Sequence, residues 1–238
     1  DGDDDDNGDD DNGDDDNGDD DNGDDDNFHW EGCGEDITFT YLGEAVTLGT
    51  IERNGLCWLD RNLGAATIPE SITDPDGYGH FFQWGRLDDG HQQLDSDLTS
   101  ELSNEDVPGH GDFITPPSSP YDWRNPQNNN LWQGEEGINN PCPDGWRLPT
   151  EDELDEERQS WTSNDGTGAF ESPLKWTMGG YRYDNGDHLF EGSWGFVWTS
   201  DPSGVSARFL RVGLNNAYFA GGLRSFGVNV RCVSEEID

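Results

Sequence analysis

The sequence predicts a strand-rich α+β domain with few helices and much loop, preceded by an extended, non-globular, aspartate-rich segment. Residues 1–27 contain no hydrophobic side chain, whereas tryptophan, glycine and short alternating runs dominate from Phe28 onward. Several of these runs alternate apolar and polar residues, as half-buried strands do, and helix signals are scarce. We therefore expect two units, residues 1–27 and residues 28–238.

The first unit is a five-residue repeat. Residues 4–27 read DDDNG four times and then DDDN, so three carboxylates alternate with an Asn-Gly turn signal. In the last unit Phe28 stands where the other units have glycine. The side chains that we expect to bind cations are Asp4, Asp5, Asp6, Asp9, Asp10, Asp11, Asp14, Asp15, Asp16, Asp19, Asp20, Asp21, Asp24, Asp25 and Asp26.

Calcium is the expected ion, because Ca²⁺ takes about six to eight oxygen ligands from carboxylates and carbonyls. A string of ions could then replace the missing hydrophobic core. The pattern resembles the calcium-binding repeats of thrombospondin type 3 modules, although those have longer units and cysteines. An EF-hand is not expected, since flanking helices are absent and Asp stands for the usual bidentate Glu. The alternative is a solvated acidic linker.

The charge of the whole chain limits its partners. The formal net charge is −41, and residues 28–238 keep 36 acidic against 12 basic side chains, of which only Lys175 is a lysine. Such a surface repels nucleic acid and anionic lipid, so neither is an expected partner. No stretch is long and apolar enough to insert into a membrane. No signal peptide is visible, so export has to be inferred.

Cysteine usage favours an extracellular or cell-surface protein. Cys33, Cys57, Cys142 and Cys232 are even in number and have no CxxC or Cys/His metal spacing. In a chain so rich in glycine and tryptophan they predict two disulfides. Four buried thiols in a cytosolic protein are the alternative.

Local signals place several elements. Alternation over residues 37–41 predicts a strand, and Arg53-Asn54-Gly55-Leu56 predicts a hairpin turn. Residues 195–198, 208–212 and 228–233 are also strand-like, with Asn215-Asn216 as a turn between the last two. A capping box that begins at Thr150 predicts a helix to about Trp161.

Five motifs in order resemble the FISUMP (Fibrobacter major paralogous) domain family over roughly residues 33–234. They are Leu56-Cys-Trp-Leu-Asp-Arg-Asn-Leu-Gly64, Cys142-Pro-Asp-Gly-Trp-Arg-Leu-Pro-Thr-Glu-Asp-Glu-Leu154, Gly179-Gly-Tyr-Arg-Tyr183, Phe196-Val-Trp-Thr-Ser200 and Phe226-Gly-Val-Asn-Val-Arg-Cys-Val233. That family is similar to C-type-lectin-like and formylglycine-generating-enzyme folds, and it occurs in exported bacterial proteins.

The resemblance implies a twisted antiparallel sheet, one or two helices and long loops. It implies a Cys142–Cys232 disulfide, which leaves Cys33 and Cys57 as the second pair. It also implies that Trp146, Trp198 and Tyr181 are core aromatics; sugar stacking is the alternative role.

Catalytic motifs are missing, so we expect no enzyme. There is no nucleophile elbow, phosphate loop or His-Glu-x-x-His, and the histidines are scattered, with a solvated surface as the expected place of each. The Glu-Pro-Asn or Gln-Pro-Asp and Trp-Asn-Asp motifs of calcium-dependent sugar-binding lectins are also absent. The polar insertion at about residues 74–140 is the expected place for a glycan or protein ligand. Possible secondary calcium ligands are Asp74 with Asp76 and Asp184 with Asp187, with ordinary Asx turns as the alternative.

We therefore expect an extracellular assembly protein whose aspartate repeat binds Ca²⁺ and mediates self-association into a filament or surface layer. A monomeric surface adhesin on a calcium-stiffened stalk is the second hypothesis. Contact with calcium minerals is a third.

Overall fold

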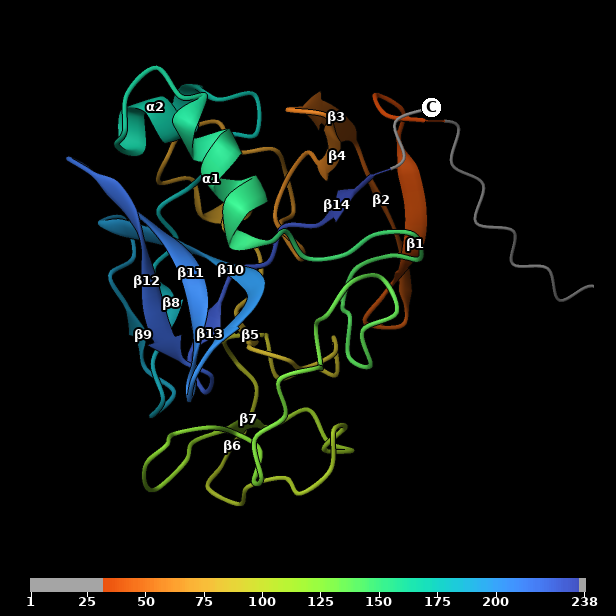
Figure 1. Ribbon diagram of the computed structural model, residues 1–238, viewed down its shortest axis with the longest axis vertical. Helices are drawn as coiled ribbons and strands as arrows, with labels where there is room; N and C mark the ends of the chain where they lie inside the picture. Colours follow the sequence, from red (N-terminus) through yellow and green to blue (C-terminus); the bar gives the residue numbers. More distant parts are fainter. Residues whose placement is uncertain (1–31, 236–238) are drawn as a thin grey trace, which may run out of the picture.

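The computed structural model describes residues 32–235. They form small sheets and two α-helices joined by long irregular segments (Figure 1). The helices are α1 (Glu151–Gln159), α2 (Gly166–Glu171) and the short 3₁₀ helix η1 (Pro75–Gly77). The strands are β1 (Ile37–Tyr41), β2 (Glu44–Leu48), β3 (Thr50–Arg53), β4 (Leu56–Leu59), β5 (Phe82–Gln83), β6 (Leu98–Thr99), β7 (Phe113–Ile114), β8 (Tyr181–Arg182), β9 (His188–Leu189), β10 (Trp194–Ser203), β11 (Ser206–Gly213), β12 (Ala217–Leu223), β13 (Gly227–Val228) and β14 (Val233–Ser234). The expected α+β class, mostly sheet with few helices, is confirmed.

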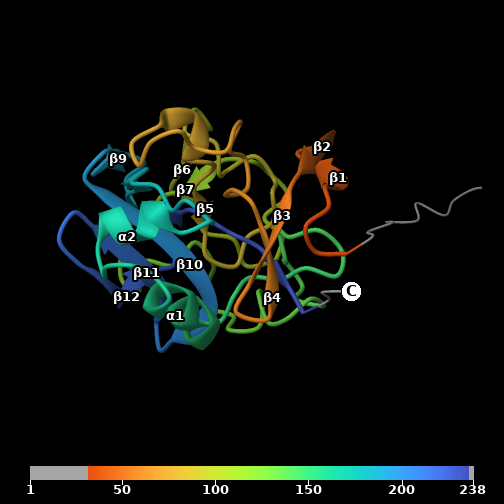
Figure 2. The same ribbon diagram turned by 90° about the horizontal axis from the view of Figure 1, so that it is seen from above.

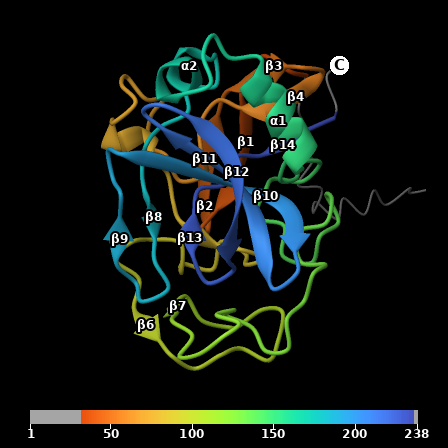
Figure 3. The ribbon, with the colours of Figure 1, turned by 60° about the vertical axis from the view of Figure 1, so that its left-hand side comes forward.

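The sheet with the longest strands is antiparallel, in the order β10-β11-β12. Side chains alternate across its two faces, as the period of a strand requires. On one face, Val197 and Leu210 pack with Leu154 of α1. On the other face, Trp198 and Phe209 join the main hydrophobic core. The sheet therefore separates two apolar clusters, and α1 and α2 cover only one of them (Figure 3).

Helix α1 begins at the predicted capping box. The Thr150 side chain accepts a hydrogen bond from the Glu153 backbone, and the Glu153 carboxylate accepts one from the Thr150 backbone at 2.8 Å. Such a box satisfies two backbone N–H groups that the helix leaves without partners. The helix ends at Gln159, two residues before the expected end at Trp161. Helix α2 was not predicted: it is short, rich in glycine and capped by Asp165.

The predicted hairpin turn at Asn54-Gly55 joins β3 to β4, and both residues have positive φ, 55° and 76°. This is the conformation for which Asn-Gly is favoured. The predicted strand at residues 37–41 is β1. It pairs with β2 through the tight turn at Leu42 and Gly43.

The prediction for the C-terminal part was wrong in two respects. The turn at Asn215-Asn216 leads from β11 into β12, a strand that was not predicted, rather than into residues 228–233. Residues 228–233 belong to no single strand, because Val228 pairs with β5, Asn229 with Val197, and Val233 with both β4 and Arg147. All residues from Gly227 to Ser234 are buried, so this segment runs through the centre of the domain.

Residues 74–140 are mostly irregular, as expected, but they are tied to the core. The indole N–H of Trp84 donates to the carbonyl of Thr199, and that of Trp123 donates to the carbonyl of Trp84. The buried guanidinium of Arg182 donates to the carbonyls of His91 and Gln93. Buried donors need such partners, so these bonds fix long loops that have little regular structure.

The β1–β2 hairpin and the strands β9 and β12 lie on opposite sides of the molecule in two views at right angles (Figures 1 and 2). The described chain begins on the hairpin side, where Cys33 is bonded to Cys57 of β4. It also ends there, since Ser234 pairs with Cys57. None of the helices within residues 32–235 is long and apolar enough to span a bilayer.

Candidate functional site

Both predicted disulfides are present. Cys33 is bonded to Cys57 and Cys142 to Cys232, so the four cysteines hold both ends of the described domain. Trp146 and Trp198 are fully buried, as the resemblance implied for core aromatics. Tyr181 is only partly buried and packs at the edge of the core.

The aspartates of the repeat, from Asp4 to Asp26, lie outside the described residues. Asp74 accepts hydrogen bonds from the backbone N–H groups of Glu70 and Asp76, which caps η1. Asp184 and Asp187 lie in the turn between β8 and β9, where the backbone N–H of Asp187 donates to the Asn185 side chain. Both pairs thus occupy turns, the alternative considered for them, and calcium binding there stays a prediction. No group of three or more His, Cys, Asp or Glu in residues 32–235 is placed to hold a metal ion.

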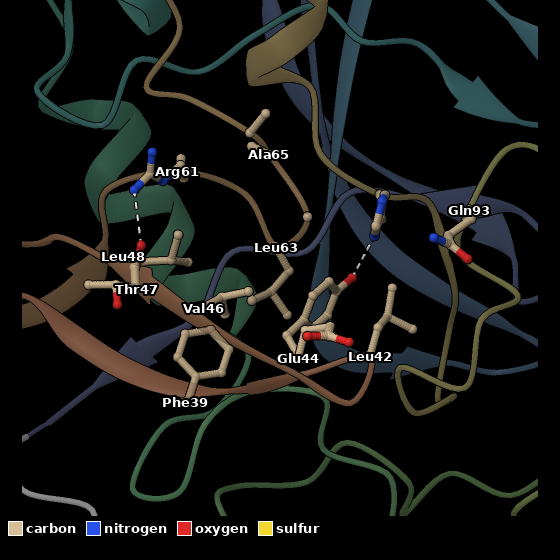
Figure 4. A pocket seen from close by; sticks show the side chains of 14 residues that line it. Phe39, Leu42, Glu44, Val46, Thr47, Leu48, Arg61, Leu63, Ala65 and Gln93 are labelled. Atoms are coloured by element: carbon tan, nitrogen blue, oxygen red, sulfur yellow. Dashed lines mark hydrogen bonds between the residues drawn. The ribbon is translucent and has the colours of Figure 1, made fainter.

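A pocket of about 590 Å³ opens between the β1–β2 hairpin and the chain that follows β4 (Figure 4). Its floor is apolar because alternate residues of the hairpin turn inward: Phe39 lies opposite Val46, and Leu48 opposite Ile37. Leu63 and Ala65 form the facing wall. We call this the hairpin pocket. Its volume is in the range of about 300–1,000 Å³ that is usual for small-ligand sites.

One end of the hairpin pocket is formed by a strained turn. Leu42 has a φ of 51°, which non-glycine residues rarely adopt. Its backbone N–H donates to the carboxylate of Asp88 at 2.9 Å, so the long segment 74–140 holds the turn in place. Strain that the surroundings maintain is found preferentially at ligand sites.

The same end carries a hydrogen-bonded pair. The hydroxyl of Tyr41 lies 2.8 Å from Nδ1 of His80, and Gln92 donates to that hydroxyl at 3.4 Å. Burial raises the pKa of Tyr41 and lowers the pKa of His80. Both shifts favour the neutral forms, so the pair supplies hydrogen-bonding groups without charge.

The other end of the hairpin pocket is charged. Arg61 forms an ion pair with Asp60 at 3.1 Å and donates to the carbonyl of Thr47 at 3.4 Å (Figure 4). A ligand with an apolar face and polar groups at its ends would therefore match this pocket.

A second, smaller pocket of about 190 Å³ lies beside the β10-β11-β12 sheet. Five aromatic rings and one guanidinium line it: Tyr181, Phe190, Phe196, Phe209, Phe226 and Arg211. The rings contact one another, with Tyr181 at 4.8 Å from Phe196, 5.1 Å from Phe226 and 5.9 Å from Phe190 between centroids. We call this the aromatic pocket.

Sequence reasoning placed His91 on a solvated surface, and this was wrong. Its side chain is 0% exposed, Nδ1 lies 2.5 Å from Asp89, and Nε2 accepts the backbone N–H of Gln83 at 3.0 Å. Arg86 also contacts Asp89, at 2.7 Å. Because both imidazole nitrogens are occupied, this cluster stabilises the loop and offers no nitrogen to a ligand.

Neither pocket was predicted. The lining of the hairpin pocket combines β1, β2 and His80, and no local motif links Tyr41 to a histidine 39 residues away. For the aromatic pocket one signal was present in the sequence: Arg211 follows Phe209 on the same face of a predicted strand, which places a cation beside aromatic rings.

Comparison with known proteins adds no assignment: no family model, curated protein or solved structure matches this chain.

Proposed function

We propose that this chain is a non-catalytic, extracellular assembly protein, in which the aspartate repeat binds Ca²⁺ and brings copies together while a FISUMP-type, C-type-lectin-like domain is displayed. The five motifs in order support the family, and the two disulfides are compatible with an oxidising, extracellular compartment. The acidic surface favours divalent cations as partners.

The observation that carries the proposal is the covalent attachment of the repeat. Asp26 precedes Cys33 by only seven residues, and Cys33 is bonded to Cys57 in the middle strand of the β14-β4-β3 sheet. Whatever the repeat binds is therefore attached to a rigid domain through a short segment.

Calcium supplies the energy of assembly in this proposal. Each repeat unit carries three carboxylates and no base, so unscreened copies repel one another. Ca²⁺ shared between carboxylates removes that repulsion and replaces it with ligation, within one chain or between chains.

The test is sedimentation velocity and negative-stain microscopy of the full chain across a Ca²⁺ titration, followed by addition of a chelator. The matched control replaces the fifteen repeat aspartates with asparagine, which keeps length and side-chain size but removes the charge. We expect large, chelator-reversible assemblies of the natural chain and none of the control. A natural chain that stays dispersed at every Ca²⁺ concentration would refute the proposal.

The hairpin pocket favours a second function, recognition of a ligand by a monomer on a calcium-stiffened stalk. Its strained turn at Leu42 and its polar ends are what a binding site requires. In this case Ca²⁺ compacts the chain without assembly. Val46→Trp, at a partly exposed position of β2 that lines the pocket, should then abolish binding in a glycan or peptide screen while the melting temperature changes little.

A further inference from the structure

Arg211 is an exception among the arginines of residues 32–235. Every other arginine in this range has a carboxylate or a carbonyl oxygen as a partner, although the domain is strongly acidic and acceptors are abundant. Arg211 donates only to the hydroxyl of Tyr218, at 2.8 Å, and its Nε is buried without an acceptor. Its guanidinium lies 3.5 Å from the ring centroid of Trp194. It is thus placed to accept an anion from another molecule.

The aromatic pocket lies directly beside this guanidinium. Phe190 forms part of its rim, is 49% exposed and has a φ of 63°. Its ring is nearly parallel to that of Tyr181, with an interplanar angle of 10°. A bulky residue held half-exposed in the left-handed region is strained, and such strain marks ligand sites. The pocket therefore suits one apolar ring.

The distance between the Arg211 guanidinium and the aromatic pocket indicates how far apart the anion and the ring of a ligand should be. Cζ of Arg211 lies 5.7 Å from the centroid of Phe196, which lines the aromatic pocket. In an extended chain, residues i and i+2 point to the same side and lie about 6.6 Å apart. An acidic residue followed two positions later by an aromatic residue would place a carboxylate near Arg211 and a ring in the pocket.

This chain contains that pattern where its repeat changes. The first four units end in Asn-Gly, but the fifth reads Asp26-Asn27-Phe28. Calcium ligation does not explain this change, because phenylalanine offers no side-chain oxygen and cannot readily take the positive φ of glycine.

The segment cannot reach the pocket of its own domain. Phe28 lies four residues before Gly32, a reach of about 14 Å in a fully extended chain. The described chain begins on the hairpin side, opposite β9 and β12 (Figures 1 and 2). A domain of this size is roughly 40 Å across. The occupant therefore has to come from a second copy.

We propose that Asp26 and Phe28 of one copy dock against Arg211 and the aromatic pocket of the next. This docking contact rests on the proposed assembly function, and it names the surfaces through which two copies would meet. Because the described chain begins on the side of the domain opposite β9 and β12, the contact is head-to-tail and extends into an open chain of copies. Calcium then neutralises the repeats, and this contact sets the direction of assembly.

The decisive variant is Phe28→Gly, which restores a complete fifth repeat unit and keeps every carboxylate. We expect Phe28→Gly and Arg211→Gln each to raise the critical concentration for Ca²⁺-driven assembly at least tenfold in sedimentation. Lys175→Gln is the matched control, since Lys175 also lies over an aromatic ring, that of Phe170. This variant should assemble as the natural chain does. Thermal melts establish that each variant is folded.

Charge exchange tests the pairing directly. Arg211→Asp and Asp26→Arg should each fail to assemble alone. An equimolar mixture should assemble, because the side chain at position 26 of each variant then meets a side chain of opposite charge at position 211 of the other. Failure of the mixture, or normal assembly of Phe28→Gly, would overturn the contact while leaving calcium-driven assembly intact.

A peptide covering residues 24–30, titrated into the full chain by calorimetry, decides the matter even where the natural chain does not assemble. Binding that is lost in Arg211→Gln supports the contact, and no binding overturns it. Binding of a uronic-acid oligosaccharide in place of the peptide would also overturn it and would identify the aromatic pocket as a site for acidic glycans.

Discussion

Gly64 lies directly against the imidazole of His80: a Cβ built on Gly64 would come within 2.3 Å of Nδ1 and 2.4 Å of Cγ. The same Nδ1 is hydrogen-bonded to Tyr41 in the hairpin pocket. Gly64 also has a φ of 79°. The polar end of the hairpin pocket therefore depends on the absence of a side chain at this position.

Gly64→Ala should lower the free energy of unfolding by about 2–4 kcal/mol, combining left-handed strain with displacement of His80. Gly55→Ala is the matched control, because Gly55 has nearly the same φ, 76°, with nothing within 4 Å of an added Cβ. The control should lose only about 1 kcal/mol. Urea unfolding of the two variants measures the difference, and equal losses would contradict the proposed contact.

The elements that sequence reasoning predicted correctly have local signals. The capping box at Thr150 and the Asn54-Gly55 turn each place their determinants within four residues. The Cys142–Cys232 pairing depended instead on the family resemblance, because four cysteines alone allow three pairings.

The elements that were missed depend on distant partners. Residues 228–233 read as one strand, yet burial on all sides and pairing with four different segments divide them. The carbonyl of the buried His91 is held by Arg182, 91 residues further along the chain, and the Tyr41–His80 bond spans 39 residues. Contacts of this kind leave no periodic pattern in the sequence, so the hairpin pocket could not be derived from it, and the aromatic pocket left only the spacing of Phe209 and Arg211.

The two disulfides should contribute unequally to stability. Cys142–Cys232 spans 90 residues and Cys33–Cys57 spans 24. The chain-entropy model gives about 4.6 kcal/mol for the longer loop and about 3.5 kcal/mol for the shorter one. Replacing each pair with serine and measuring guanidinium unfolding tests this order. Because Cys33 also anchors the repeat in the proposed function, its pair should have the larger effect on Ca²⁺-driven assembly, and the reverse result would argue against that anchor.

Acid should destabilise the domain through His91. Burial, helped by the charge of Arg86, lowers the pKa of His91 to about 3, and the hydrogen bond with Asp89 only partly opposes this. Unfolded histidine has a pKa of about 6.5, so the unfolded chain takes up the proton first as the pH falls. The His91 contribution is therefore fully present above pH 6.5 and decreases by about 1.4 kcal/mol per pH unit below it.

Asp89 affects the stability of the domain only at a lower pH than His91 does. Burial raises its pKa, but the hydrogen bond from His91 and the charge of Arg86 outweigh this and lower the pKa to about 2. Its contribution is lost only below the pKa of an unfolded aspartate, about 3.9. Between pH 6.5 and 4.5 we therefore expect His91 alone to remove roughly 2–3 kcal/mol. Urea unfolding of the natural chain and of His91→Gln, compared at each pH, isolates this contribution. Parallel curves for the natural chain and His91→Gln would show that His91 does not titrate as a buried neutral imidazole.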